Sequence, residues 1–100
     1  MAGQLPMDPL DPERIRPNSP FEAQMQQLLS NCAALLQAAG SWPQAVLSLT
    51  VYLDDLAHWD EMDRCCAAFF ASHRPARTVL GVAAIRKGYA VQASLVAVRP

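Results

Sequence analysis

Charged side chains are scarce in this sequence, and the two signs nearly balance. The 100 residues contain eight Lys and Arg against nine Asp and Glu, so the formal net charge is −1 at pH 7. The basic residues neither outnumber the acids nor cluster, which argues against a nucleic-acid partner bound through its phosphates. A chain of this length is enough for one domain, and we expect residues 1–100 to form a single one.

Cysteine is sparse as well, with only Cys32, Cys65 and Cys66 in the chain. Two of them are adjacent and cannot form an ordinary disulfide with each other, and no CxxC or Cys/His spacing typical of zinc is present. We therefore expect no metal and no cofactor. The cysteines are interpreted as small apolar helix residues of a reduced, intracellular protein.

Long apolar runs are also missing, although 52% of the residues are hydrophobic. The apolar stretches are too short and interrupted to cross a membrane, and the N-terminus does not have the pattern of a signal peptide. No phosphate-binding glycine loop, GxSxG or HExxH motif occurs. These absences predict a cytoplasmic location and no membrane partner.

The sequence does contain two helical patterns. After a proline-rich start with a possible strand at 2–5, Ser19 and Glu22 form a capping-box pattern around Pro20. Apolar residues then recur every three or four positions until Gly40, which predicts a helix that ends there. A second helix is expected after Asp54 or Asp55. Its apolar stripe would consist of Leu56, Trp59, Met62, Cys66, Phe69 and Phe70.

Three further segments are predicted strands. Residues 46–53 alternate, which places Leu47, Leu49, Val51 and Leu53 on one face. Residues 76–84 and 89–98 are joined through Arg86, Lys87 and Gly88, a link short enough for an antiparallel hairpin. The resulting order is β-α-β-α-β-β. We expect an α/β (α+β) fold in which both helices cover one face of a mixed sheet. The other, semi-apolar face would be covered by further subunits.

Arg77 stands out because it interrupts an otherwise apolar strand, where an arginine is costly unless it is paired. It could form an ion pair or be exposed where the strand begins, which the residues alone favour. Alternatively, its guanidinium could grip a carboxylate ligand at two points. His58 and His73 flank the second helix and could be imagined with nearby aspartates as a metal site, but solvated helix ends are the favoured interpretation.

The run from His73 to Val82 resembles the stretch typical of the RidA/YjgF family. Residues 2–9, 35–41, 50–55, 68–70 and 87–88 are similar to other landmarks of that family, in the same order. The resemblance implies a chorismate-mutase-like fold and a homotrimer with ligand clefts between subunits. It also implies hydrolysis of enamines and imines to keto acids and ammonia. Arg77 would bind the ligand carboxylate, assisted by backbone groups near Val79.

Departures from the family pattern modify this expectation. Met1 falls almost on the family's GQ-P motif, so the resemblance implies a domain without the first strands and without their cleft tyrosine. The glutamate of the last strand corresponds to Ser94, with Gln92 two residues earlier. Asp63 stands at a position that is often asparagine, and Val79 at one that is often cysteine.

We therefore expect a small-carboxylate-binding domain with degenerate deaminase machinery. Its predicted ligand-binding residues are Arg77, Val79, Ser94 and Asp63. The alternatives are an active 2-iminobutanoate/2-iminopropanoate deaminase, an accessory module of a diphthine–ammonia ligase, and a purely structural fragment with Arg77 in an ion pair. Ribonuclease activity, described for some family members, is the weakest alternative because the chain carries little basic charge.

Overall fold

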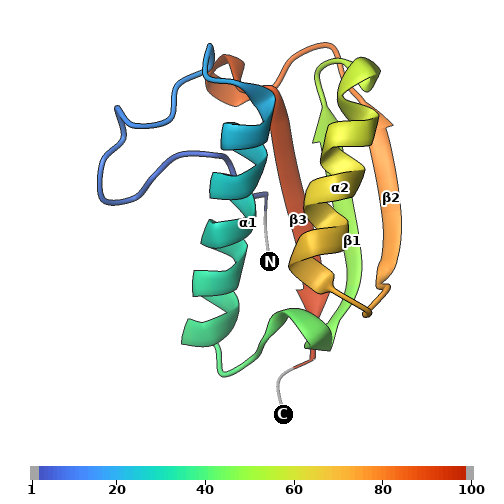
Figure 1. The fold of residues 1–100 in the computed structure, drawn as a ribbon. Helices are drawn as coiled ribbons and strands as arrows, with labels where there is room; N and C mark the ends of the chain where they lie inside the picture. Colours follow the sequence, from blue (N-terminus) through green and yellow to red (C-terminus); the bar gives the residue numbers. More distant parts are fainter. Residues whose placement is uncertain (1–2, 99–100) are drawn as a thin grey trace.

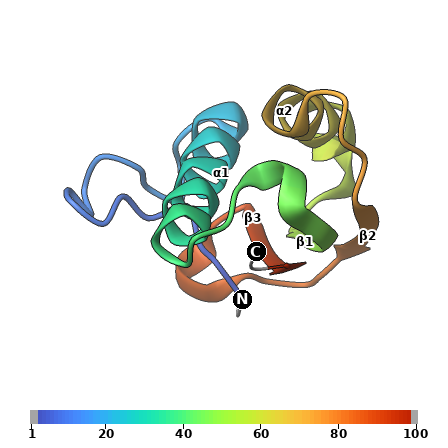
Figure 2. The same cartoon turned by 90° about the horizontal axis from the view of Figure 1, so that it is seen from below.

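Two helices and a three-stranded sheet form the body of the protein in the computed structural model, which describes residues 3–98. The elements follow in the order α1 (Phe21–Ala38), β1 (Val46–Leu53), α2 (Trp59–Phe70), β2 (Ala76–Gly81) and β3 (Val91–Ala97) (Figure 1). Short 3-10 turns precede β1, α2 and β3. Both helices lie on the same side of the sheet (Figure 2), which confirms the predicted two-layer α/β architecture.

Strand β1 lies in the middle of the sheet, parallel to β2 and antiparallel to β3. The predicted hairpin between the last two strands is therefore wrong. The segment between them crosses from one edge of the sheet to the other, and Ile85 and Tyr89 are buried along it. The short link at Arg86–Gly88 is a 3-10 turn within this crossing. The apolar β1 thereby gains a neighbour on each side, which a hairpin of β2 and β3 would not provide.

The predicted first strand is reduced to a single antiparallel bridge, in which Gln4 and Ala93 exchange both backbone hydrogen bonds. Ala2, at the start of that prediction, lies outside the described residues. A Cβ at Gly3 would lie 2.2 Å from Nε2 of Gln92, so a larger residue here would require the Gln92 side chain to move. The N-terminal segment thus runs beside β3 at the edge of the sheet that β2 does not occupy.

Helix α1 begins one residue later than predicted, with Pro20 as its N-cap and no capping side chain. The Ser19 hydroxyl instead accepts a hydrogen bond from the backbone N–H of Arg16 at 2.9 Å, so the predicted capping box does not form. The end of the helix is as predicted. Ala38 is its last residue, and Gly40 follows in the left-handed region at φ 76°.

The core lies between the helices and the inner face of the sheet, where Leu49, Val51 and Leu53 are buried as predicted. Leu47 is exposed instead, because an irregularity between Val46 and Ser48 shifts the pairing and turns Val46 inward. In α2, residues Met62, Cys66 and Phe70 are buried. Leu56 and Trp59 are largely exposed, since they lie in and just after the 3-10 turn that precedes the buried stripe.

Across the described residues, no helix is both long and apolar enough to cross a membrane.

Candidate functional site

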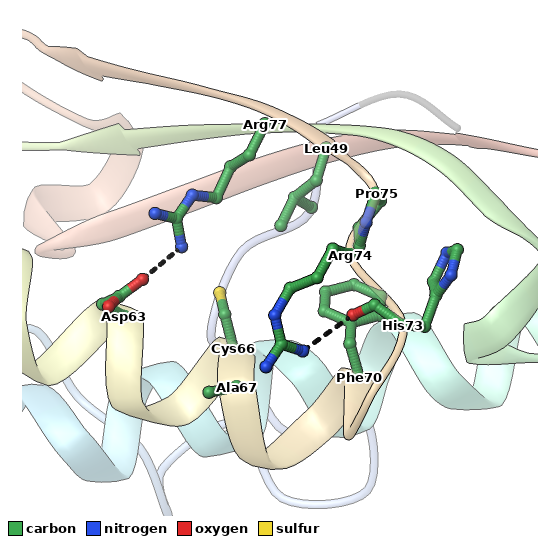
Figure 3. A pocket seen from close by; sticks show the side chains of 9 residues that line it. All are labelled: Leu49, Asp63, Cys66, Ala67, Phe70, His73, Arg74, Pro75 and Arg77. Carbon is green, nitrogen blue, oxygen red and sulfur yellow. Dashed lines mark hydrogen bonds and ion pairs between the residues drawn. The ribbon is translucent and has the colours of Figure 1, made fainter.

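A cavity of about 470 Å³ lies between one face of α2 and the beginning of β2. Figure 3 shows the side chains around it, which come from the middle of β1, from α2, from the segment that joins α2 to β2 and from the start of β2. The lining residues are Leu49, Asp63, Cys66, Ala67, Phe70, His73, Arg74, Pro75 and Arg77. A volume of this size is in the range, about 300–1,000 Å³, in which proteins bind small molecules.

Arg77 reaches this cavity from the second position of β2. It pairs in register with Leu49, and therefore points to the side of the sheet that carries the helices. Its Nη1 donates to Oδ1 of Asp63 at 2.6 Å and lies 4.0 Å from Sδ of Met62. Arg77 thus forms the ion pair that the residues alone favour, and it does so at the wall of a cavity.

The ion pair with Asp63 occupies only part of the guanidinium. Among the described residues, the Arg77 guanidinium contacts the Asp63 carboxylate through Nη1 and otherwise only the sulfur atoms of Met62 and Cys66, which are weak acceptors. The Arg77 and Asp63 side chains are 28% and 55% exposed, and ion pairs as accessible as this contribute little to stability. A ligand carboxylate could therefore share or replace Asp63 at small cost.

Arg74 is a second cation at the cavity, and it is not among the predicted ligand-binding residues. Its Nη1 donates to the carbonyl oxygens of Ala71 and of His73, the latter at 3.0 Å. Ala71 has a positive φ of 54°, so these bonds help hold the tight turn that ends α2. The sequence does contain a signal for this second cation. Arg74 and Arg77 lie on either side of Pro75-Ala76, in a segment that the proline favours as extended.

The two histidines are not solvated helix ends as predicted. Nε2 of His73 lies 2.7 Å from the carbonyl oxygen of Val46, so this nitrogen must be the donor, and the ring makes an edge contact with Phe70. His58 stacks on Phe21 with 4.3 Å between ring centroids. Both imidazoles therefore join elements of the fold. Within residues 3–98, no group of three or more His, Cys, Asp and Glu side chains could hold a metal ion.

Cys66 contributes its sulfur to the wall of the cavity and is only 4% exposed. Burial raises the pKa of the Cys66 thiol to about 11, although the neighbouring Arg77 acts in the opposite direction. A thiol with this pKa remains protonated at neutral pH. It is a weak nucleophile and provides an apolar surface rather than a reactive group.

The remaining predicted ligand-binding residues, Val79 and Ser94, lie apart from the cavity. Val79 pairs with Val51 on the inner face and packs against the core, next to Arg77 on that face but outside the cavity lining. Ser94 pairs with Thr50, whose side chain is on the outer face. Within one chain, Arg77 and Asp63 thus meet, whereas Ser94 lies on the opposite side of the sheet.

The fold is that of a small α/β domain with two helices on one face of a mixed sheet. Its arginine-lined cavity is a candidate anion site. Comparison with known proteins identifies the class further. Residues 1–99 match the sequence model of the family described as endoribonuclease L-PSP. The chain belongs to this family, the RidA/YjgF family, as the resemblance of its motifs indicated.

Individual relatives agree over almost the whole chain. Human 2-iminobutanoate/2-iminopropanoate deaminase is 31% identical over 99 residues, which are 99% of this chain and 71% of the human protein. The structure of RidA from the Antarctic bacterium Psychrobacter is 32% identical with a TM-score of 0.88, covering 95% of this chain and 75% of that one. Escherichia coli TdcF, solved with bound serine, is 26% identical with a TM-score of 0.91, covering 100% and 79% of the two chains.

Proposed function

We propose that this domain binds a small carboxylate metabolite through Arg77. The supporting observation is the partly unpaired guanidinium at the cavity, whose planar fork suits two-point recognition of a carboxylate. The serine bound to the related TdcF is itself a small carboxylate, which is in keeping with this class of ligand. Nothing among the described residues favours a role as a ligase module.

Substitution of Arg77 and its partner tests this proposal, with 2-oxobutanoate as the probe in calorimetric titrations. Arg77→Gln should weaken binding by roughly tenfold or more, because a charge-assisted pair of hydrogen bonds is lost. Asp63→Asn should strengthen binding a few-fold, because it removes the charge that competes with the ligand. A purely structural ion pair predicts no effect of either substitution on the probe.

Arg64→Gln is the matched control, since Arg64 also lies on α2 but is not part of the cavity lining. It should change the affinity for 2-oxobutanoate less than twofold. Equal affinities in the wild type, Arg77→Gln and Arg64→Gln would contradict the assignment of Arg77.

A second candidate function, imine hydrolysis, is favoured by the presence of a carboxylate in the same cavity. Asp63 could accept a proton from a water molecule that attacks the C=N carbon of an imino acid held by Arg77. The products would be the 2-oxo acid and ammonium. The name of the human relative is consistent with this chemistry. If Asp63 does not act as the base, Ser94 stands in place of the family glutamate, and the chain is a binding domain with degenerate deaminase machinery.

Ammonia release from freshly generated 2-iminobutanoate separates the two candidates. The binding-only function predicts a rate equal to that of buffer. The hydrolytic function predicts turnover that is lost in Asp63→Asn, although that variant binds 2-oxobutanoate more tightly than the wild type. Turnover that survived in Asp63→Asn would exclude Asp63 as the base.

A homotrimer, the third part of the proposal, is supported by the uncharged outer face of the sheet. In three rows across β2, β1 and β3, this face presents Ala76, Ser48 and Val96; Thr78, Thr50 and Ser94; and Leu80, Tyr52 and Gln92. Leu80 and Val96 are 45% and 56% exposed there. An uncharged sheet face with exposed aliphatic residues suits contact with further copies of the chain.

A further inference from the structure

We infer that the cavity selects a dicarboxylate, with Arg77 holding the carboxylate of a 2-oxo or 2-imino acid and Arg74 holding a second carboxylate at the other end of the ligand. This inference rests on the proposed function, because it takes the role of Arg77 from there. It adds the chemical class of the side chain that the ligand carries.

The first observation is the charge balance of the cavity. Arg74 and Arg77 contribute two positive charges to the lining, and Asp63 contributes the only negative charge of the lining residues. Asp63 is bound to Arg77, and no described carboxylate lies within ion-pair distance of Arg74. The cavity therefore holds one cation that the described part of the chain does not neutralise.

The second observation is the way in which Arg74 is held. Its Nη1 is fixed by the carbonyl oxygens of Ala71 and His73, while Nε and Nη2 have no partner among the described residues. In Figure 3 the Arg74 side chain extends along the cavity beside Cys66 and Ala67. Part of the fork is thus positioned by the backbone, and part is available to an anion.

The third observation is the apolar part of the cavity wall that the two arginines share. Leu49, Cys66 and Phe70 lie there, and each is buried. Arg74 and Arg77 are three residues apart, and both side chains line this one cavity. A short methylene chain between two carboxylates suits this arrangement, since its CH₂ groups would contact the apolar wall while both ends meet a cation.

Two five-carbon acids that differ only in the distal carboxylate test the inference. Calorimetric titration should give an affinity for 2-oxoglutarate roughly tenfold higher than for 2-oxopentanoate, as expected for one charge-assisted interaction. Arg74→Gln should remove this preference, lowering the affinity for 2-oxoglutarate roughly tenfold and that for 2-oxopentanoate less than threefold. Arg74→Lys should keep part of the preference, because the positive charge remains. Arg64→Gln should keep all of it.

Arg74 also holds the turn after α2, so thermal unfolding must show that each variant is folded. If Arg74→Gln is not folded, Arg74→Lys is used in its place. Equal affinity for the two acids, or a preference that persists in Arg74→Gln, would overturn the inference. If 2-oxopentanoate binding still depends on Arg77, the proposed function survives this failure. If 2-oxoglutarate binding depends on Arg74 but not on Arg77, the proposed function and the two-arginine inference both fail, and only a separate anion site at Arg74 remains. Binding of neither acid would refute both.

Discussion

Gln24 illustrates how one buried polar side chain holds three segments together. It is 1% exposed, and its Nε2 donates to the carbonyl oxygens of Pro17 and Ser19 at 3.0 and 2.9 Å. Its Oε1 accepts from the backbone N–H of Ala90 at 2.9 Å. The amide therefore ties the proline-rich segment and the start of β3 to α1, with each of its polar atoms satisfied.

Gln24→Met keeps the length of the side chain and removes these hydrogen bonds. The buried N–H of Ala90 would lose its acceptor, so the free energy of unfolding should fall by about 1–3 kcal/mol. Urea denaturation measures this change. Gln26→Met is the matched control on the same helix, since Gln26 is exposed and bonds only weakly to Glu22 at 3.3 Å. A similar loss in both variants would contradict the role of Gln24.

At the scale of the elements, α1 and α2 each place a buried thiol in the core between them. Cys32 of α1 is 1% exposed and Cys66 of α2 is 4% exposed. Burial raises the pKa of the Cys32 thiol from 9.0 to about 11, and the nearby Cys66 adds to this shift. Both thiols are packed between the helices in the neutral form. The stability of this packing should therefore change at a pH high enough to ionise them.

The sign of that dependence follows from the two pKa values of Cys32. Below pH 9 the thiol is protonated in the folded and the unfolded chain, so its contribution to stability is fully present. Between pH 9 and about 11 the unfolded chain loses this proton and the folded chain keeps it. The free energy of unfolding should therefore decrease with pH in this window, by up to about 1.4 kcal/mol per pH unit for this group.

Cys32→Ala tests this contribution by urea denaturation at pH 8, 9, 10 and 11. The variant should be less stable at pH 8 because of the lost side-chain volume, and its stability should decrease less steeply above pH 9. Cys65→Ala is the control, since Cys65 is only partly buried and should change the slope less. Parallel curves for the wild type and Cys32→Ala would show that ionisation of Cys32 does not limit stability.

At the scale of the whole molecule, the two faces of the sheet differ in what covers them. The helices cover the inner face (Figure 2), whereas the outer face carries Leu80 and Val96, which are exposed. Light scattering of the proposed trimer should give three times the chain mass of 10.9 kDa. Val96→Glu should lower the mass toward that of one chain, because three carboxylates would be brought into an apolar contact.

Leu10→Glu is the control for this experiment. Leu10 is 94% exposed in the N-terminal segment and is not on the sheet. The same added charge at this position should leave the mass unchanged. A wild-type mass of 10.9 kDa, or a trimer that persists in Val96→Glu, would contradict the outer face as the contact between subunits.

Local sequence patterns determined much of this fold. The spacing of apolar residues predicted both helices and three of the four buried side chains of β1, because burial of one face imposes a period that is visible in the sequence. Gly40 was correctly placed after α1, since few other residues adopt a positive φ readily. The motifs around Arg77 indicated the family that the comparisons confirm.

Tertiary structure alone decided which strands are neighbours and which polar groups meet. A short link between two strands does not reveal that β1 lies between them, because strand pairing depends on contacts distant in sequence. Asp63 and Arg74 reach the cavity of Arg77 only because α2 packs over the start of β2. Ser94 is separated from Arg77 by the sheet itself, since alternate residues of a strand point to opposite faces. The alternation of side chains along a strand is a local property of the sequence. The set of residues that line a site depends instead on how distant elements pack.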